Sequence, residues 1–264
     1  MDIKDINRSI VKTYRKNIFS KVIKAVKDYN LIENGDNIAV CISGGKDSFL
    51  LSLILEEIRK YQNIDFKLKH IVMDPGYNKE AIDLIKENSK LFNLDVHIFK
   101  SNIFNDIKDE KNPCYICARK RRGHLYNKAK ELGCNKIALG HHFDDVIETV
   151  LLNVFYAGSF GSMLPKLKSE NYENMELIRP LYLVKEYDII KWTNYNNLKF
   201  INCACTLENK NFDSKRLEIK NLIKTLRKNN PSIDNNILKS TENVNLNTLL
   251  GYTKDKKHSF LDDY

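Results

Sequence analysis

Hydrophobic residues in the first 150 or so positions follow two alternating patterns. Short apolar runs predict strands, and these runs span 37–42, 69–74, 95–100 and 135–140. Each run precedes a longer stretch with apolar residues at helical spacing, and these stretches span 49–61, 80–92, 118–132 and 144–156. Strands that alternate with helices indicate βαβ units, so we expect an α/β fold with a Rossmann-like parallel sheet and helices on both faces.

The two ends of the chain show a different pattern. Apolar residues between Lys4 and Tyr29 recur at helical spacing, and the polar turn Asn34-Gly35-Asp36 ends that segment. After Arg179-Pro180 the strand signal fades, 187–195 and 214–227 are predicted as helices, and the polar residues from Thr253 on are expected to be loose. We therefore expect three parts: an N-terminal helical segment at 1–35, a nucleotide-type α/β domain at 36–182, and a mostly helical C-terminal region at 183–264.

Composition narrows the class of protein. The chain has 264 residues, 42% of them hydrophobic, which suits a folded globular protein. No stretch approaches the roughly 18 apolar residues that a membrane span needs, and the N-terminus is too polar for a signal peptide, so a cytoplasmic protein without a membrane partner is expected. The net charge of +9 favours a polyanionic partner. In a reducing compartment the six cysteines indicate metal binding or redox chemistry first, although Cys41 and Cys134 fit small packing residues.

A glycine turn joins the strand at 37–42 to the helix that follows. Its residues are Ser43, Gly44, Gly45, Lys46, Asp47 and Ser48. The glycines let backbone N–H groups approach an anion, and the start of the helix adds positive potential, so this turn predicts a phosphate site rather than a plain tight turn. It is not a Walker loop, because Gly-Lys is followed by an aspartate, whose carboxylate suits Mg²⁺ on a pyrophosphate.

The turn Ser-Gly-Gly-Lys-Asp-Ser resembles the signature of the PP-loop ATP pyrophosphatases. That resemblance implies an enzyme that binds ATP with Mg²⁺, releases pyrophosphate and leaves AMP on a carbonyl-type oxygen, from which a nucleophile then displaces it. Residues Ser43 to Ser48 would hold the phosphates. Asp74, in the segment Val-Met-Asp-Pro-Gly-Tyr, is expected beside the adenosine.

A second polar segment, Gly-His-His-Phe-Asp-Asp, follows the strand at 135–140. Carboxyl ends of parallel strands meet at one edge of a sheet, which brings Gly140, His141 and Asp145 to the expected nucleotide site, and PP-loop enzymes carry a similar segment there. Helix capping by Asp144 is the structural alternative for the acidic residues. A zinc site from the histidines is set aside, since no third ligand stands at a suitable spacing.

Two cysteine segments offer metal ligands. Cys114 and Cys117 form a Cys-x-x-Cys pair, and Cys203 and Cys205 lie in the later segment Asn-Cys-Ala-Cys. The pair alone fits a redox pair, half of a zinc site or part of an iron–sulfur site. Four thiolates would suit a closed structural zinc, whereas three would leave one iron of a [4Fe-4S] cluster open for chemistry.

The order of the motifs resembles the tRNA 2-thiocytidine synthetase family. Those motifs are SGGKDS, CYICARKRRG, GHHFDD, IRPL and FINCAC, and together they cover about residues 37–205. The resemblance implies an ATP-dependent enzyme that adenylates C2–O of the cytidine opening the tRNA anticodon loop. A [4Fe-4S] cluster on Cys114, Cys117 and Cys203 would then deliver the replacing sulfur, with a donor such as a cysteine desulfurase and a possible homodimer. Family members often carry Pro-Cys-x-x-Cys at the third ligand, so Cys205 stays an alternative or additional ligand here.

The basic run Arg119, Lys120, Arg121 and Arg122 directly follows the first cysteine pair. It fits either a solvated helix face or, beside the nucleotide edge, a contact to tRNA phosphates. Three other functions stay open. A lysidine-type enzyme is disfavoured by the paired cysteine segments, and a 2-thiouridine type by the lack of additional Cys/His modules. A zinc-stapled RNA-binding protein without catalysis would bind zinc and release no pyrophosphate.

Overall fold

The structure is a computed structural model of the chain, and it describes residues 2–61, 63–101, 103, 113–201, 210–254 and 257–259. Within these ranges the side chains at 113–115, 117–118, 210–214 and 257–258 are not described. The chain forms two compact units. Unit 1 comprises Met1–Val146 and Leu164–Ser214, and unit 2 comprises Ile147–Met163 and Lys215–Tyr264.

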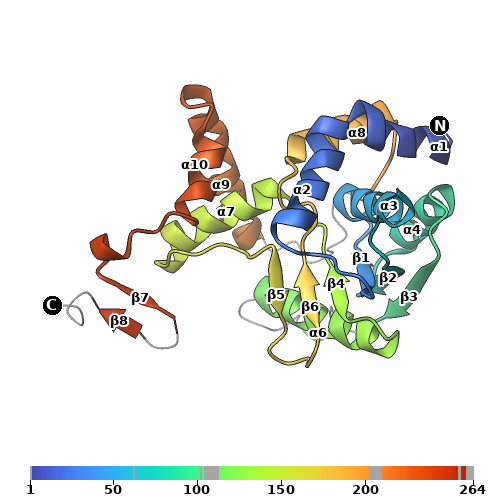
Figure 1. Cartoon of the computed structure of the whole chain (residues 1–264), viewed down its shortest axis with the longest axis horizontal. Helices are drawn as coiled ribbons and strands as arrows, with labels where there is room; N and C mark the ends of the chain where they lie inside the picture. Colours follow the sequence, from blue (N-terminus) through green and yellow to red (C-terminus); the bar gives the residue numbers. More distant parts are fainter. Residues whose placement is uncertain are drawn as a thin grey trace. The chain divides into compact units, whose positions relative to one another are not determined.

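Unit 1 is built around a six-stranded sheet in the order β3-β2-β1-β4-β6-β5 (Figure 1). The strands are β1 (Asn37–Ile42), β2 (Lys67–Asp74), β3 (Val96–Lys100), β4 (Lys136–Ala138), β5 (Lys166–Lys168) and β6 (Glu176–Ile178). All neighbours pair in parallel except β5 and β6, which are antiparallel. The expected Rossmann-like parallel sheet is confirmed, and the sequence patterns missed only the two short strands at its β5 edge.

The helices of the sheet domain follow the predicted ones closely. They are α3 (Lys46–Tyr61), α4 (Lys79–Leu91), α6 (Pro113–Glu131), α7 (Phe143–Leu152) and α8 (Glu186–Tyr195). The N-terminal helical segment consists of α1 (Ile3–Arg8), the π-helical turns η1 (Ser9–Thr13) and η2 (Arg15–Phe19), and α2 (Ser20–Asp28). The helical spacing predicted in this segment is observed, but two π-helical turns interrupt the α-helical register, which the pattern did not predict.

Side chains of β1 point alternately to two hydrophobic cores. Ile38, Val40 and Ile42 belong to the larger core, which also contains the buried faces of α3, α8 and the N-terminal helices. Ala39 and Cys41 belong to a second core against α6. A strand with both faces buried is expected for a parallel sheet between helix layers, and Figure 1 shows α3 and α6 on opposite sides. The expectation of helices on both faces is therefore confirmed.

A buried lysine ties β4 to the chain that precedes β1. Lys136 is only 2% exposed, and its Nζ lies 2.7 Å from Asp36 Oδ2 and 3.4 Å from Glu176 Oε2. Burial by itself lowers the pKa of Lys136, but the hydrogen bond and attraction to Asp36, reinforced by Glu176 and Glu33, raise it overall. The ammonium thus stays charged and clamps the amino ends of β1, β4 and β6.

Unit 2 is mostly helical. It contains the last turns of α7, the π-helical turn η3 (Asn153–Ala157), most of α9 (Lys210–Asn229), α10 (Ile233–Ser240) and the short 3-10 helix η4 (Leu246–Thr248). β7 (Gly251–Thr253) and β8 (Lys257–Ser259) form an antiparallel hairpin. The expectation that the residues from Thr253 on are loose was therefore wrong for this hairpin. Backbone pairing between its two strands holds it together although its side chains are polar.

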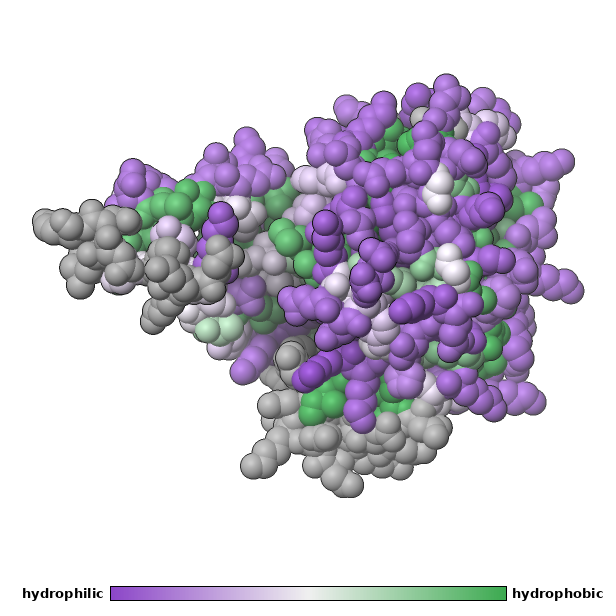
Figure 2. Space-filling view, turned by 60° about the horizontal axis from the view of Figure 1, so that its bottom comes forward, coloured by the Kyte–Doolittle hydropathy of each residue, from purple (hydrophilic) through white to green (hydrophobic). Residues whose placement is uncertain are grey.

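The surface is mainly hydrophilic in the view of Figure 2, with hydrophobic patches between the polar side chains. In the part of the chain that the structure describes, every helix is too short or too polar to cross a membrane.

Candidate active site

Two of the predicted motifs, Ser43–Ser48 and Gly140–Asp145, lie at the carboxyl ends of β1 and β4. β1 has β2 on one side and β4 on the other, so the order of strands reverses at β1. Such a switch point leaves a crevice between the loops that follow the two central strands, and ligands of open α/β sheets bind there. The turn Ser43–Gly45 leaves β1 and leads into α3, and Gly140–His142 leads from β4 into α7.

The glycine turn is tightly packed on its outer side. Gly44 has a φ of +88°, which only glycine adopts without strain. A Cβ atom there would lie 2.6 Å from Cδ1 of Ile201 and 3.0 Å from Cγ1 of Ile85. The backbone N–H of Ile201 also donates to the Gly44 carbonyl at 3.2 Å. The segment that ends at Ile201 therefore holds the turn in place from behind.

The serines brace the turn, and a second glycine lets another loop approach it. Ser48 Oγ accepts from the backbone N–H of Ser43 at 3.2 Å and donates to the Gly45 carbonyl at 2.9 Å. A Cβ atom on Gly140 would lie 3.1 Å from the backbone carbon of Asp47 and the backbone nitrogen of Ser48. A residue with a side chain would push the start of α3 and the loop after β4 apart by a few tenths of an ångström, so glycine favours this close approach.

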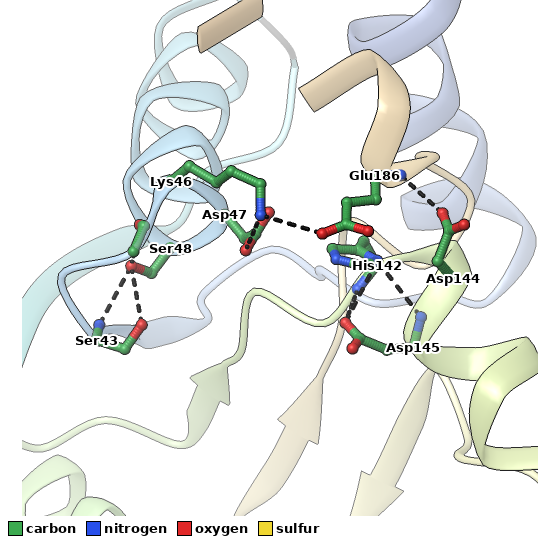
Figure 3. Close-up of polar contacts among 9 residues, drawn as sticks. Ser43, Lys46, Asp47, Ser48, His142, Asp144, Asp145 and Glu186 are labelled. Carbon is green, nitrogen blue, oxygen red and sulfur yellow. Dashed lines mark hydrogen bonds and ion pairs between the residues drawn. The ribbon is translucent and has the colours of Figure 1, made fainter. Parts of the chain in front are cut away.

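Lys46 lies between two carboxylates (Figure 3). Its Nζ is 3.2 Å from Asp47 Oδ2 and 3.5 Å from Oε1 of Glu186, the first residue of α8. The other carboxylate oxygen of Asp47, Oδ1, is buried and has no hydrogen-bond partner among the described residues. Burial raises the pKa of Asp47, and attraction to Lys46 and His142 opposes that rise. A buried carboxylate with an unused oxygen is suited to receive a cation that arrives with a ligand.

The acidic and histidine residues of GHHFDD have separate structural roles. Asp145 Oδ2 accepts from the backbone N–H of His142 at 3.0 Å, and the Asp145 N–H points to His142 Nδ1 at 3.4 Å. Asp144 Oδ2 accepts from the backbone N–H of Glu186 at 2.7 Å (Figure 3). Asp144 therefore binds the start of α8 and so fixes where Glu186 stands beside Lys46.

A pocket of about 360 Å³ opens at this edge. Six of the residues predicted to bind ATP line it: Ser43, Asp47, Ser48, Gly140, His141 and Asp145. Apolar side chains of Met73, Leu125 and Leu139 line it as well. This size and this mixture of apolar wall and few polar groups are typical of nucleotide and other small-molecule sites.

The other four residues predicted to bind ATP stand outside the lining of this pocket: Gly44, Gly45, Lys46 and Asp74. Asp74 Oδ1 accepts from the backbone N–H groups of Gly76 and Tyr77, at 2.9 and 2.7 Å, and so shapes the loop after β2. The aromatic ring of Tyr77 lines the pocket instead. In this arrangement Asp74 shapes the pocket indirectly, through the loop that carries Tyr77.

Two residues of the basic run on α6 reach the pocket. Arg121 and Arg122 line it, although Arg122 is exposed as Arg119 is. Arg121 Nη2 donates to Tyr77 Oη at 2.8 Å. Arg179, which follows β6, is 5% exposed, and burial followed by repulsion from Arg122 lowers its pKa to about 10. Arg121 and Arg122 thus bring positive charge to the same pocket as the carboxylates of Asp47 and Asp145, and an anionic ligand would reduce the repulsion between Arg122 and Arg179.

The side chains of the four cysteines predicted as metal ligands are outside the part of the chain that the structure describes. Positions 114 and 117 lie in the first turns of α6, the helix that also carries Arg121, but their side chains are outside the described set. Cys203 and Cys205 lie outside the described residues altogether. Where side chains are described, no group of three or more His, Cys, Asp and Glu residues is arranged to hold a metal ion.

Two residues of the site were missed by sequence reasoning. Glu186 reaches Lys46 from a helix 140 positions away, and nothing in its local pattern separates it from an ordinary acid at a helix start. Tyr77 lies in the segment expected beside the nucleotide, but Asp74 was named there instead. The aromatic residue shortly after the end of a predicted strand could have indicated Tyr77, which lines the pocket. His142 belonged to the recognised motif, and its contact with Asp145 gives it a positioning role.

Comparisons with known proteins give a consistent result. The model of the PP-loop domain family matches residues 14–225. A tRNA-cytidine(32) 2-sulfurtransferase from Geotalea uraniireducens is 41% identical, with 88% of this chain and 93% of that protein covered. The enzyme of the same name from Geobacter metallireducens is 40% identical, with 90% and 93% covered. Among solved structures, the U34-tRNA thiolase NcsA from Methanococcus maripaludis with its [4Fe-4S] cluster has a TM-score of 0.67 at 25% identity, covering 84% of this chain and 76% of that one.

Proposed function

This chain belongs to the PP-loop family and, within it, to the tRNA-cytidine(32) 2-sulfurtransferases, and from this premise we propose that it catalyses ATP-dependent 2-thiolation of cytidine in tRNA. The oxygen at C2 of the cytidine attacks the α-phosphorus of ATP and pyrophosphate leaves. Sulfur then adds to C2 and AMP leaves. Adenylation is needed because an amide-like oxygen is a poor leaving group, whereas AMP is a good one.

The observation that carries this proposal is that one pocket is lined both by Ser43, Asp47 and Ser48 and by residues of the loop after β4. The N–H groups at the start of α3 and the glycines of the turn suit the phosphates of ATP. Asp47, with its buried and unpartnered Oδ1, suits the Mg²⁺ that accompanies them. The ammonium of Lys46, which pairs with Asp47 and Glu186, suits a phosphate oxygen of the bound ATP.

The remaining pocket residues have roles that follow from their chemistry. Gly140, His141 and Asp145 line the nucleotide from the β4 side, and Asp74 orders the loop that presents Tyr77. We assign Arg121 to the phosphates rather than to tRNA, because a guanidinium offers parallel donors to the charge that builds up as pyrophosphate leaves. Exposed Arg119, and Lys120 beside it, keep the expected contact with tRNA.

Cys114, Cys117 and Cys203 are the proposed ligands of a [4Fe-4S] cluster, which supplies the sulfur for the second half of the reaction when it is bound. The cluster in the similar thiolase NcsA supports this assignment, as does the spacing of positions 114 and 117 within one turn of α6. Cys205 is the alternative third ligand.

Four further properties complete the proposal. tRNA is the substrate, and its presence in the cytoplasm makes that the expected location. The sulfur donor would be an enzyme that releases sulfur from cysteine, of the cysteine desulfurase type. A homodimer is the expected assembly.

The experiment that tests this function combines two assays on anaerobically purified protein. Pyrophosphate release is measured with ATP, Mg²⁺ and tRNA, and 2-thiocytidine is measured by mass spectrometry of digested tRNA after sulfide is added. Asp47→Asn keeps the shape of the side chain and removes its charge, so both signals should fall at least about 100-fold, as for other losses of electrostatic stabilisation. Asp28→Asn, at an exposed surface ion pair, is the matched control and should keep both signals.

The outcomes separate the alternatives. Pyrophosphate release with a lysine-containing product would indicate a lysidine-type enzyme, and thiolated uridine would indicate the wrong base. If the protein still holds stoichiometric zinc and releases no pyrophosphate after reconstitution with iron and sulfide, it is an RNA-binding protein and not this enzyme.

A further inference from the structure

Unit 2 exposes several large aromatic side chains within one short segment. Phe155, Tyr156 and Phe160 are 59%, 40% and 51% exposed. They lie in residues 153–160, here called the aromatic segment. It consists of the π-helical turn η3 and the three residues that follow it, which begin with Gly158. Single exposed hydrophobic residues are ordinary, but three aromatic rings within six positions indicate a surface that binds something.

Helix α9 packs beside the aromatic segment within unit 2. The Nζ of Lys215 lies 5.1 Å from the ring centre of Tyr156, and Tyr156 Oη donates to Glu218. Arg216 Nε lies 3.0 Å from Glu148 Oε2 on the preceding helix α7. The aromatic segment and α9 therefore form one local surface.

The exposed side of α9 is strongly basic. Its sequence contains seven Lys and Arg residues against two Asp and Glu residues. Ile219 and Ile223 are buried, whereas Lys220, Lys224 and Lys228 are exposed. Four-residue spacing places these three lysines on one side of the helix, about 6 Å apart along its axis. The resulting row of ammonium groups is suited to a chain of phosphates.

Exposed aromatic rings beside a row of lysines favour RNA, rather than a second copy of the chain, as the binding partner. An identical partner would bring a second row of lysines to this face, and the nearby carboxylates Glu148 and Asp234 already contact arginines of α9. Unpaired RNA bases stack on exposed aromatic rings while cationic side chains follow the backbone. On α6, Arg121 and Arg122 line the nucleotide pocket, so that helix offers fewer charges for docking.

We propose that the aromatic segment and the Lys220–Lys228 side of α9 form a docking surface for tRNA, with bases stacked on the exposed rings and lysines on the phosphates. This inference rests on the proposed function, which makes tRNA the substrate. The surface binds the body of the substrate and takes no part in the chemistry.

The test measures binding of a fluorescently labelled tRNA transcript to the full-length protein by anisotropy, between about 50 and 200 mM salt. Phe155→Ala with Phe160→Ala should weaken binding at least about tenfold, given the usual contribution of base stacking. Lys220→Ala with Lys224→Ala should reduce the slope of log K against log salt by about 1.5, the value for two lost phosphate contacts.

Matched controls come from unit 1. Tyr61 is 74% exposed, so Tyr61→Ala removes an equally accessible aromatic ring. Lys86→Ala with Lys90→Ala removes two exposed lysines at the same four-residue spacing from α4. Both controls should retain wild-type affinity and salt slope. ATP binding without tRNA should be unchanged in every variant, which shows that the nucleotide site is intact.

The outcomes distinguish the two proposals. If the wild-type protein fails to bind tRNA, the proposed function itself fails. If it binds tRNA and the unit 2 variants bind with the same affinity and slope as the controls, the docking surface is refuted and the function stands. If light scattering shows that the unit 2 variants lose a dimer while each chain keeps its tRNA affinity, the surface belongs to a second copy and the inference is wrong.

Discussion

Replacing Gly44 with alanine tests whether the glycine turn is held as the structure describes. Two separate penalties are expected. The φ of +88° costs an L-residue about 1–2 kcal/mol. The added Cβ, 2.6 Å from Cδ1 of Ile201, costs a further ~1–3 kcal/mol of overpacking. Gly44→Ala should therefore lower the free energy of unfolding by about 2–5 kcal/mol.

A double-mutant cycle with Ile201→Val separates the two penalties. Valine lacks the Cδ1 atom that the new Cβ would meet, and alone this change should cost about 0.5–1.5 kcal/mol. In the Ile201→Val background the overpacking penalty shrinks to the contact with Ile85, at 3.0 Å, whereas the backbone penalty remains. The two substitutions should thus couple favourably by about 1 kcal/mol.

The assay is urea unfolding followed by the fluorescence of Trp192. It is the chain's single tryptophan, it is fully buried in unit 1, and its ring centre lies 6.5 Å from that of Phe200, next to Ile201. Additivity within about 0.5 kcal/mol would refute the contact between Gly44 and Ile201. A loss below about 1 kcal/mol for Gly44→Ala would refute the positive φ as well.

Three further predictions concern buried ionisable groups. Burial raises the pKa of Asp47. Protonation of Asp47 therefore stabilises the ATP-free protein fully below the ordinary aspartate pKa of about 3.9, and this contribution to stability is lost as pH rises through the raised pKa. Mg²⁺-ATP binding should tighten with rising pH in that window, and calorimetry in two buffers should detect the proton that Asp47 releases. Asp47→Asn should lack that part of the proton release. Burial raises the pKa of Cys41, and that of Cys134 to about 11, so both thiols should resist iodoacetamide at pH 8 until urea is added. Lys136→Met leaves the buried carboxylate of Asp36 without its cation and should destabilise unit 1 by ~3–5 kcal/mol in urea unfolding; an unchanged midpoint would contradict this.

The central strands and helices were predictable because their patterns are long and local. The run Asn37–Ile42 was predicted to its ends, and the next two strands began within two residues of the predicted positions. β5 and β6 were not predictable, because three residues are too short for a period-two pattern. Their register depends on partners elsewhere: Leu139 N–H donates to the Ile178 carbonyl just past the end of β4.

The sequence predicted those parts of the site in which the functional residues are neighbours along the chain. The turn from Ser43 to Ser48 and the pair Gly140-His141 gave a local signal and line one pocket or its loop. Glu186 and the packing of Ile201 on Gly44 have no local signal, since both arise when distant segments fold together. Arg121 had a signal for positive charge, but only the direction of α6 decides which anion it faces.

Helix α6 connects the two halves of the proposed reaction. The cysteine positions 114 and 117 lie in its first turns, and Arg121, one turn further, lines the nucleotide pocket and bonds to Tyr77. Position 117 is thus about 6 Å from position 121 along the helix axis. In the proposed reaction, one helix would therefore carry both the cysteine pair and an arginine of the pocket. Because one rigid helix sets that separation, a change that tilts α6 should impair sulfur transfer and adenylation together, whereas loss of a cysteine should stop only sulfur transfer.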